Sequence, residues 1–106
     1  MTDTEYIEFL RTEAEERNAL LNNADTMSNY MTECLQGELL AIQDISDQIQ
    51  NNPATAAEYM KNTLKSMNFQ LDHGAETRLH AYLLYFIHAE KVRTGQSYSD
   101  LLAKYA

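Results

Sequence analysis

The chain has 106 residues, of which 44% are hydrophobic, and a formal net charge of −8. This length and apolar content predict a single domain over residues 1–106 with a modest core, and they exclude wholesale disorder. The acidic balance argues against direct binding to nucleic acid, because phosphate contacts require a basic face. No apolar run in the chain approaches the roughly 18 residues of a membrane span.

The cysteine count and the charge at the N-terminus predict a reducing compartment. Cys34 is the single cysteine, so no intramolecular disulfide can form. The first eight residues carry three acids and no base, which is not the pattern of a secretory signal. We therefore expect a cytoplasmic protein, in the host cytoplasm if a phage encodes it.

The first predicted helix begins at Thr2 or Thr4 and ends near Leu21. Either threonine can cap it, and the acids in its first turn suit the positive end of the helix dipole. Its apolar stripe consists of Tyr6, Phe9, Leu10, Ala14, Leu20 and Leu21. Turn-forming residues follow from Asn22 onward and predict its end.

A second helix is predicted from about Thr26 to Gln50, with an apolar stripe that one carboxylate interrupts. The stripe consists of Met31, Leu35, Ile42, Ile45 and Ile49. Glu38 lies within this stripe, and Gly37 beside it permits a close helix crossing or a kink. Glu38 either lies near solvent, reaches a partner, or fixes helix register or oligomer state. Its candidate partners are Arg78, Lys65 and a tyrosine hydroxyl.

Asn52 and Pro53 predict the start of a third helix, as its N-cap and its first helical residue. We expect residues 68–74 to connect it to a fourth helix, which Asp72 would cap. The fourth helix should run to about residue 93 and stop at Gly95, because glycine adopts the left-handed conformation that ends helices.

The chain is organised around an apolar run at residues 81–87, inside the fourth predicted helix. One face of this helix consists of Ala75, Leu79, Tyr82, Phe86 and Ala89. Leu84, Tyr85 and Ile87 fall outside that face, so the helix is apolar on all sides. Because one small domain offers few layers to surround such a helix, we predict a homodimer that forms through these three residues.

A capping box at Ser97 and Asp100 predicts a short closing helix, which includes Leu101, Leu102 and Tyr105. The apolar run could instead form a buried strand, but no second segment alternates apolar and polar residues to pair with it. We therefore predict an all-α fold, a compact bundle of four main helices plus a short C-terminal helix.

Two groups of residues are candidates for chemistry, and neither predicts an enzyme. His73, Glu76 and His80 share one helix face and could bind a transition metal, but their spacing matches no di-metal or zinc motif. Exposed polar side chains are the favoured interpretation. Cys34 lies beside an apolar stripe without a catalytic signature, which favours a packed thiol. We expect no catalytic residue, no cofactor and no metal.

The acidic N-terminal half carries the leading functional hypothesis. Residues 1–52 hold eleven of the sixteen acids and only two bases, Arg11 and Arg17. We expect a non-catalytic inhibitor or regulator of a protein partner with a basic surface, such as a nucleic-acid-binding protein. Phages and mobile elements encode small acidic inhibitors, which is an analogy of size and charge alone. The expected contact residues are Glu5, Glu8, Glu13, Glu15, Glu16, Asp25, Glu33, Asp44 and Asp47. Reversing the charges of Glu13, Glu15 and Glu16 should weaken this binding.

Three other interpretations stay open. The acids could serve solubility alone, the chain could be an assembly or chaperone-type adaptor that holds a partner helix, or it could be a metal-binding helical bundle. Salt separates recognition by acids from apolar docking, because only the former weakens steeply as ionic strength rises. The identity of the partner does not follow from the sequence.

Overall fold

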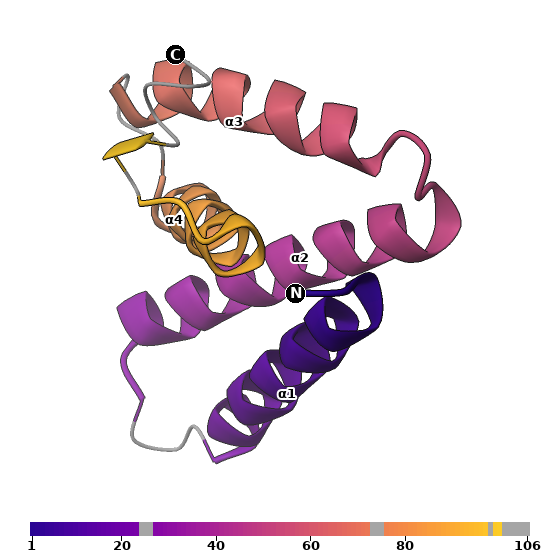
Figure 1. Ribbon diagram of the computed structural model, residues 1–106. Coiled ribbons are helices and arrows are strands. Elements are labelled where there is room, and N and C mark those ends of the chain that lie inside the picture. Colours follow the sequence, from indigo (N-terminus) through magenta and orange to yellow (C-terminus); the bar gives the residue numbers. More distant parts are fainter. Residues whose placement is uncertain (24–26, 73–75, 98, 101–106) are drawn as a thin grey trace.

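The computed structural model is all-α, as the sequence predicts. Its helices are α1 (Asp3–Asn22), α2 (Asn29–Asn51), α3 (Ala56–Asp72) and α4 (Thr77–Thr94). The structure describes residues 1–23, 27–72, 76–97 and 99–100, and no strand occurs within these ranges. The expected compact bundle fits only loosely, because α4 is seen nearly end-on while α2 and α3 lie across the view (Figure 1). The fourth helix therefore crosses its neighbours steeply instead of running alongside them.

The start of α1 is a complete capping box. The Thr2 hydroxyl accepts a hydrogen bond from the Glu5 amide, and the Glu5 carboxylate accepts one from the Thr2 amide, both at 3.1 Å. The hydrogen bond from the Thr2 amide is the main cause that lowers the pKa of the Glu5 carboxyl, because it favours the charged form. The cap is therefore Thr2, not Thr4, and the helix ends at Asn22, one residue after the predicted end.

The boundary between α2 and α3 differs from the prediction. Asn52 is the C-cap of α2, and its amide donates to the Gln48 carbonyl at 2.9 Å. Residues 53–55 form a turn in which the Thr55 amide donates to the Asn52 carbonyl at 3.1 Å, and α3 begins at Ala56. The prediction that Asn52 caps α3 and Pro53 starts it is wrong, because α2 continues far enough to use Asn52 for its own end.

The connection between α3 and α4 is shorter than predicted. Residues 68–72 are helical, so Asp72 belongs to α3 and does not cap the next helix. Polar residues cost a helix interior only a few tenths of a kcal/mol each, too little to end it there. Glu76 caps α4 instead, where its carboxylate accepts a hydrogen bond from the Leu79 amide at 2.9 Å. The predicted end is confirmed, since Gly95 follows α4 with φ 74°.

The core forms where α1, α3 and α4 pack around the central helix α2 (Figure 1). The buried apolar cluster consists of Tyr6, Leu10, Ala41, Ile42, Ile45, Ile49, Ala56, Met60, Leu83, Tyr85, Phe86, Ile87 and Ala89. Five of its residues lie close together on α4, between positions 83 and 89, so this helix is buried on most of its circumference. The chain itself thus covers most of the apolar run, with Leu84 left exposed.

Gly37 marks the crossing of α2 and α4. A Cβ atom at this position would collide with the carbonyl oxygen of Arg78 and lie 3.1 Å from the Cβ atom of Ala81. The predicted close crossing is confirmed. At the C-terminal end, the Ser97 hydroxyl accepts a hydrogen bond from the Asp100 amide at 3.2 Å, as a capping box requires. The rest of the predicted closing helix, with Leu101, Leu102 and Tyr105, lies outside the described residues.

Candidate functional site

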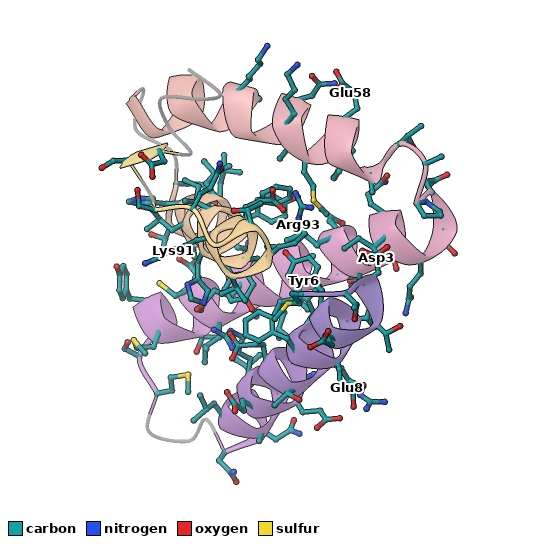
Figure 2. The ribbon with its side chains drawn as sticks, in the orientation of Figure 1. Asp3, Tyr6, Glu8, Glu58, Lys91 and Arg93 are labelled. Atoms are coloured by element: carbon teal, nitrogen blue, oxygen red, sulfur yellow. The ribbon has the colours of Figure 1, made fainter. Side chains whose placement is uncertain are left out.

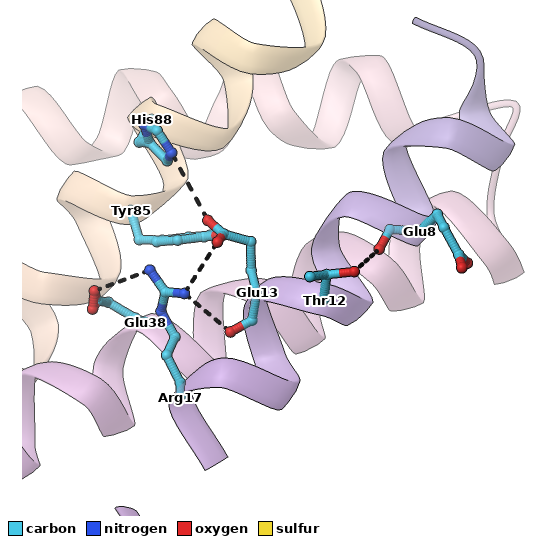
Figure 3. A network of polar contacts seen from close by, with 7 residues as sticks. All are labelled: Glu8, Thr12, Glu13, Arg17, Glu38, Tyr85 and His88. Atoms are coloured by element: carbon cyan, nitrogen blue, oxygen red, sulfur yellow. Dashed lines mark hydrogen bonds and ion pairs between the residues drawn. The ribbon is translucent and has the colours of Figure 1, made fainter. Parts of the chain in front are cut away.

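A polar network joins α1, α2 and α4 at one end of the core (Figure 3). The guanidinium of Arg17 lies between the carboxylates of Glu13 and Glu38, at 3.5 Å from an oxygen of each. It also donates to the Glu13 carbonyl at 3.0 Å. Its carbon atom lies 4.8 Å from the centre of the Tyr85 ring, which is a cation–π geometry. Arg17 thus ties the end of α1 to the two helices behind it.

The α4 side of this network supplies a phenol and an imidazole. The Tyr85 hydroxyl donates to the Glu13 carboxylate at 3.0 Å, and His88 Nε2 lies 4.0 Å from the same carboxylate. Burial and then the charge of Glu13 raise the pKa of Tyr85, because both disfavour the phenolate. Tyr85 is therefore a neutral donor at physiological pH.

A groove opens beside the network, between the N-terminal parts of α2 and α4. Its volume is about 470 Å³. It is lined by Arg17, Tyr30, Cys34, Glu38, Thr77, His80, Ala81, Leu84, Tyr85 and His88. We call it the α2–α4 groove. Tyr30 and Leu84 at its sides are 65% and 46% exposed, which is high for large apolar residues. The volume falls in the range of ligand-binding sites, and about half of the lining side chains are polar or charged.

No family model, curated protein or solved structure matches this chain. Its function must therefore be argued from its own residues. None of the helices in the described ranges is long and apolar enough to cross a membrane.

The predicted acidic surface is divided by the fold. Four of its residues are exposed on α1: Glu5, Glu8, Glu15 and Glu16. At about 100° per residue they share about 100° of the helix circumference, on the side away from the core. We call these four residues the acidic stripe. Glu8 projects from the outer side of α1 in Figure 2 and forms an ion pair with Arg11.

The other predicted acids lie elsewhere. Glu13 points inward to the network, and Asp44 accepts a hydrogen bond from the Tyr82 hydroxyl at 2.6 Å. Glu33 is half-buried and Asp47 exposed, both on α2, while Asp25 lies outside the described residues. The structure thus brings together four of the nine predicted residues, all on α1.

Two of the three weak metal candidates, Glu76 and His80, lie within the described residues. Glu76 uses its carboxylate to cap α4, His80 is exposed beside the α2–α4 groove, and His73 lies outside the described residues. No group of three or more metal-binding side chains occurs in the part of the chain that is described. Cys34 is partly exposed and also lines the groove, so it is less enclosed than a packed core thiol.

The residues predicted for self-association have different positions. Tyr85 and Ile87 are buried in the core of a single chain, whereas Leu84 is exposed at the groove. The homodimer stays a prediction, and Leu84 is the residue of the three that a second chain could reach.

Sequence reasoning missed a buried ion pair in α4. Glu90 is fully buried, and both of its oxygens accept hydrogen bonds from Arg93, from Nε and from Nη2, each at 2.7 Å. The spacing could have revealed it, because Glu90 lies four and seven residues after Phe86 and Leu83 and shares their buried face. The buried Tyr6 hydroxyl near this pair has no hydrogen-bond partner among the described residues.

Proposed function

We propose that this chain is a non-catalytic binding protein that inhibits or regulates a protein partner with a basic surface. The acidic stripe supports this, because its four carboxylates are exposed on one side of α1. Arg11 is the base beside them. The second arginine of the helix, Arg17, is turned inward between Glu13 and Glu38 and is mostly buried. The outer side of α1 is therefore strongly negative.

Several carboxylates on one side of a helix act together. Each exposed carboxylate contributes less than about 1 kcal/mol alone, because water and salt screen it. A cluster that faces a basic surface adds these contributions, speeds association and orients the partner. Recognition through the acidic stripe should therefore weaken steeply as the salt concentration rises. The expected cytoplasmic location belongs to the same proposal.

A charge reversal of Glu15 and Glu16 tests the proposal. Both residues are exposed and have no hydrogen bond or ion pair among the described residues, so Glu15→Lys with Glu16→Lys should leave the fold unchanged. Glu13, which the sequence also suggested for this test, is unsuitable because lysine there would break the inward network. We expect wild-type protein to capture a basic protein from an extract of its native host at low salt, and the variant to lose it.

A matched control carries the same change of charge outside α1. Glu58→Lys with Asp100→Lys reverses two exposed acids away from α1 and should retain the captured protein. Equal capture by the wild type and by both variants would mean that the acids of α1 serve solubility alone. Loss in both variants would mean that overall charge, not the stripe, holds the partner.

A second candidate function, an adaptor that holds a partner helix, is favoured by the α2–α4 groove. Tyr30 and Leu84 present apolar surface there without a covering segment among the described residues. Apolar docking of a helix would survive high salt, whereas capture by the acidic stripe would not. Capture that resists salt and is lost on Leu84→Ser would favour the adaptor.

A further inference from the structure

The two halves of α1 are held to the rest of the protein in different ways. Its two buried residues, Tyr6 and Leu10, both lie in the first half, and neither exposes any surface. In the second half, residues 11–22, every side chain is exposed or only half-buried. We call residues 11–22 the arm. A helical segment this short is marginally stable in water by itself, so the arm depends on contacts with other helices.

Apolar packing supplies little of the support that the arm needs. Of its half-buried apolar residues, Ala14 packs against the buried apolar cluster and Leu21 does not. Leu20, in the last turn, is 52% exposed. Hydrophobic stabilisation scales with the apolar area that is buried, so the partly buried methyl group of Ala14 contributes much less than the side chain of Tyr6 or Leu10.

Polar contacts hold the arm instead (Figure 3). The Arg17 guanidinium lies 3.5 Å from an oxygen of Glu38 on α2 and 4.8 Å from the centre of the Tyr85 ring on α4. The Glu13 carboxylate accepts a hydrogen bond from the Tyr85 hydroxyl at 3.0 Å. Both arm residues are mostly buried, so these contacts are stronger than they would be in open water. Contact between the arm and α4 therefore depends on Glu13 and Arg17.

The arm also forms one side of the α2–α4 groove. Among the described residues that line the groove, Arg17 comes from α1 and all the others come from α2 or α4. Cys34 on α2 lines the same groove. Movement of the arm away from α4 would therefore open this side of the groove and give larger molecules access to Cys34.

We propose that the arm is a gate on the α2–α4 groove, held closed by Glu13 and Arg17. It opens by local unfolding, while Tyr6 and Leu10 keep the first half of α1 in place. Segments with few buried apolar contacts open more often than the core, because their opening costs less than unfolding of the whole protein. This motion needs no partner, so it is independent of the proposed function.

Amide hydrogen exchange, followed by NMR, measures the opening. The amides of residues 15–21 donate within the arm, and those of residues 7–10 donate within the first half of α1. After correction for intrinsic rates, we expect the arm amides of the wild type to exchange at least about tenfold faster than those of the first half. Urea at low concentration should leave the arm rates unchanged, because local opening exposes little surface.

Variants with a matched control test the contacts that hold the arm. Arg17→Met, which keeps the apolar part of the side chain, should speed exchange in the arm about tenfold. Tyr85→Phe removes only the hydroxyl that donates to Glu13 and should speed it about threefold. Because Tyr85 is on α4, that effect cannot come from the helix propensity of α1. Arg11→Met is the control, since the exposed ion pair of Arg11 with Glu8 lies within α1, and it should change the arm rates less than about twofold.

The single thiol, Cys34, reports whether the opening reaches the groove. Iodoacetamide is small, whereas a maleimide that carries a large dye enters the closed groove less readily. The ratio of the two labelling rates cancels any change in the reactivity of the thiol itself. We expect the ratio of the bulky to the small reagent to rise at least about twofold in Arg17→Met and Tyr85→Phe, and to stay unchanged in Arg11→Met.

Any of three results would overturn the proposal. The first is equal exchange in both halves of the wild-type α1, or arm rates that rise with urea as steeply as those of α2. The second is an arm that exchanges alike in the wild type, Arg17→Met and Tyr85→Phe, with circular dichroism to verify that each variant is folded. If Arg17→Met does not fold, the milder Tyr85→Phe decides. The third is an unchanged ratio of labelling rates in both variants, which would mean that the arm opens without opening the groove.

Discussion

The buried pair of Glu90 and Arg93 is a residue-scale feature with a direct consequence for stability. Glu90 is fully buried, and the two parallel hydrogen bonds from Arg93 at 2.7 Å each occupy one acceptor site, one on each of its oxygens. Such a pair adds little relative to apolar residues of the same size, because removing two charges from water is costly. Breaking it is different, since the remaining carboxylate would be buried without its counter-ion.

We therefore expect Arg93→Met to lower the free energy of unfolding by about 3 kcal/mol, measured by urea denaturation at neutral pH. The double variant Glu90→Gln with Arg93→Met should recover most of this loss, because it removes the buried charge as well. If Arg93→Met were as stable as the wild type, the carboxylate of Glu90 would have to reach solvent or another donor.

The crossing of α2 and α4 is the feature that matters at the scale of elements. The backbones approach so closely at Gly37 that a side chain there meets the carbonyl oxygen of Arg78, which cannot rotate away. Alanine is favoured over glycine in a helix by about 1 kcal/mol, so helix propensity alone would make Gly37→Ala stabilising. Overpacking against a fixed backbone costs about 1–3 kcal/mol and acts in the opposite direction.

We expect the overpacking to dominate, so that Gly37→Ala lowers the free energy of unfolding by about 1–2 kcal/mol. Gln43→Ala is the control, because Gln43 is exposed on the same helix and gains only helix propensity. Thermal unfolding followed by circular dichroism measures both. A Gly37→Ala variant more stable than the wild type would mean that the two helices can separate at no cost.

At the scale of the whole molecule, one small chain buries most of a helix that is apolar on all sides. Helix α2 passes under α4. Helix α1 packs on the α2 side of this pair, and α3 packs on the α4 side (Figure 1). Three of the tyrosines within this packing, Tyr6, Tyr82 and Tyr85, have raised pKa values. Burial is the first cause that raises the pKa of each hydroxyl, and nearby carboxylates add to it, including Asp44 for Tyr82.

The raised pKa values predict loss of stability at alkaline pH. Above the ordinary tyrosine pKa of about 10, the unfolded chain releases these protons while the folded chain keeps them. The unfolded state then binds fewer protons, so the free energy of unfolding falls by about 1.4 kcal/mol per pH unit for each such tyrosine. Below about pH 10 this contribution is fully present. Urea titrations from about pH 8 to about pH 11 should show the decline.

The Tyr82→Phe variant shows how much of that decline is due to Tyr82. It should be less stable at neutral pH by about 1 kcal/mol, because Asp44 loses its donor at 2.6 Å. Its stability should nevertheless fall less steeply above about pH 10, because one titrating group is gone. Equal slopes for the variant and the wild type would mean that Tyr82 ionises alike in the folded and unfolded chain.

Local features of the chain were predictable because their causes are local. The all-α class, the cap by one of the two threonines at the start of α1 and the end of α4 at Gly95 each follow from residues within one or two helical turns. The boundary at Pro53 was mispredicted because Asn52 suits either helix end, and which helix uses it depends on how far α2 extends.

What the sequence alone determined is therefore the helices, the acidic half and the apolar run. The tertiary structure decided which side chains meet. It turned Arg17 toward Glu13 and Glu38, residues 4 and 21 positions away, and so left the acidic stripe without that cation. It also buried Tyr85 and Ile87 within one chain and exposed Leu84 beside Tyr30. Contacts between helices depend on their crossing geometry, and periodicity within a single helix carries no information about that geometry.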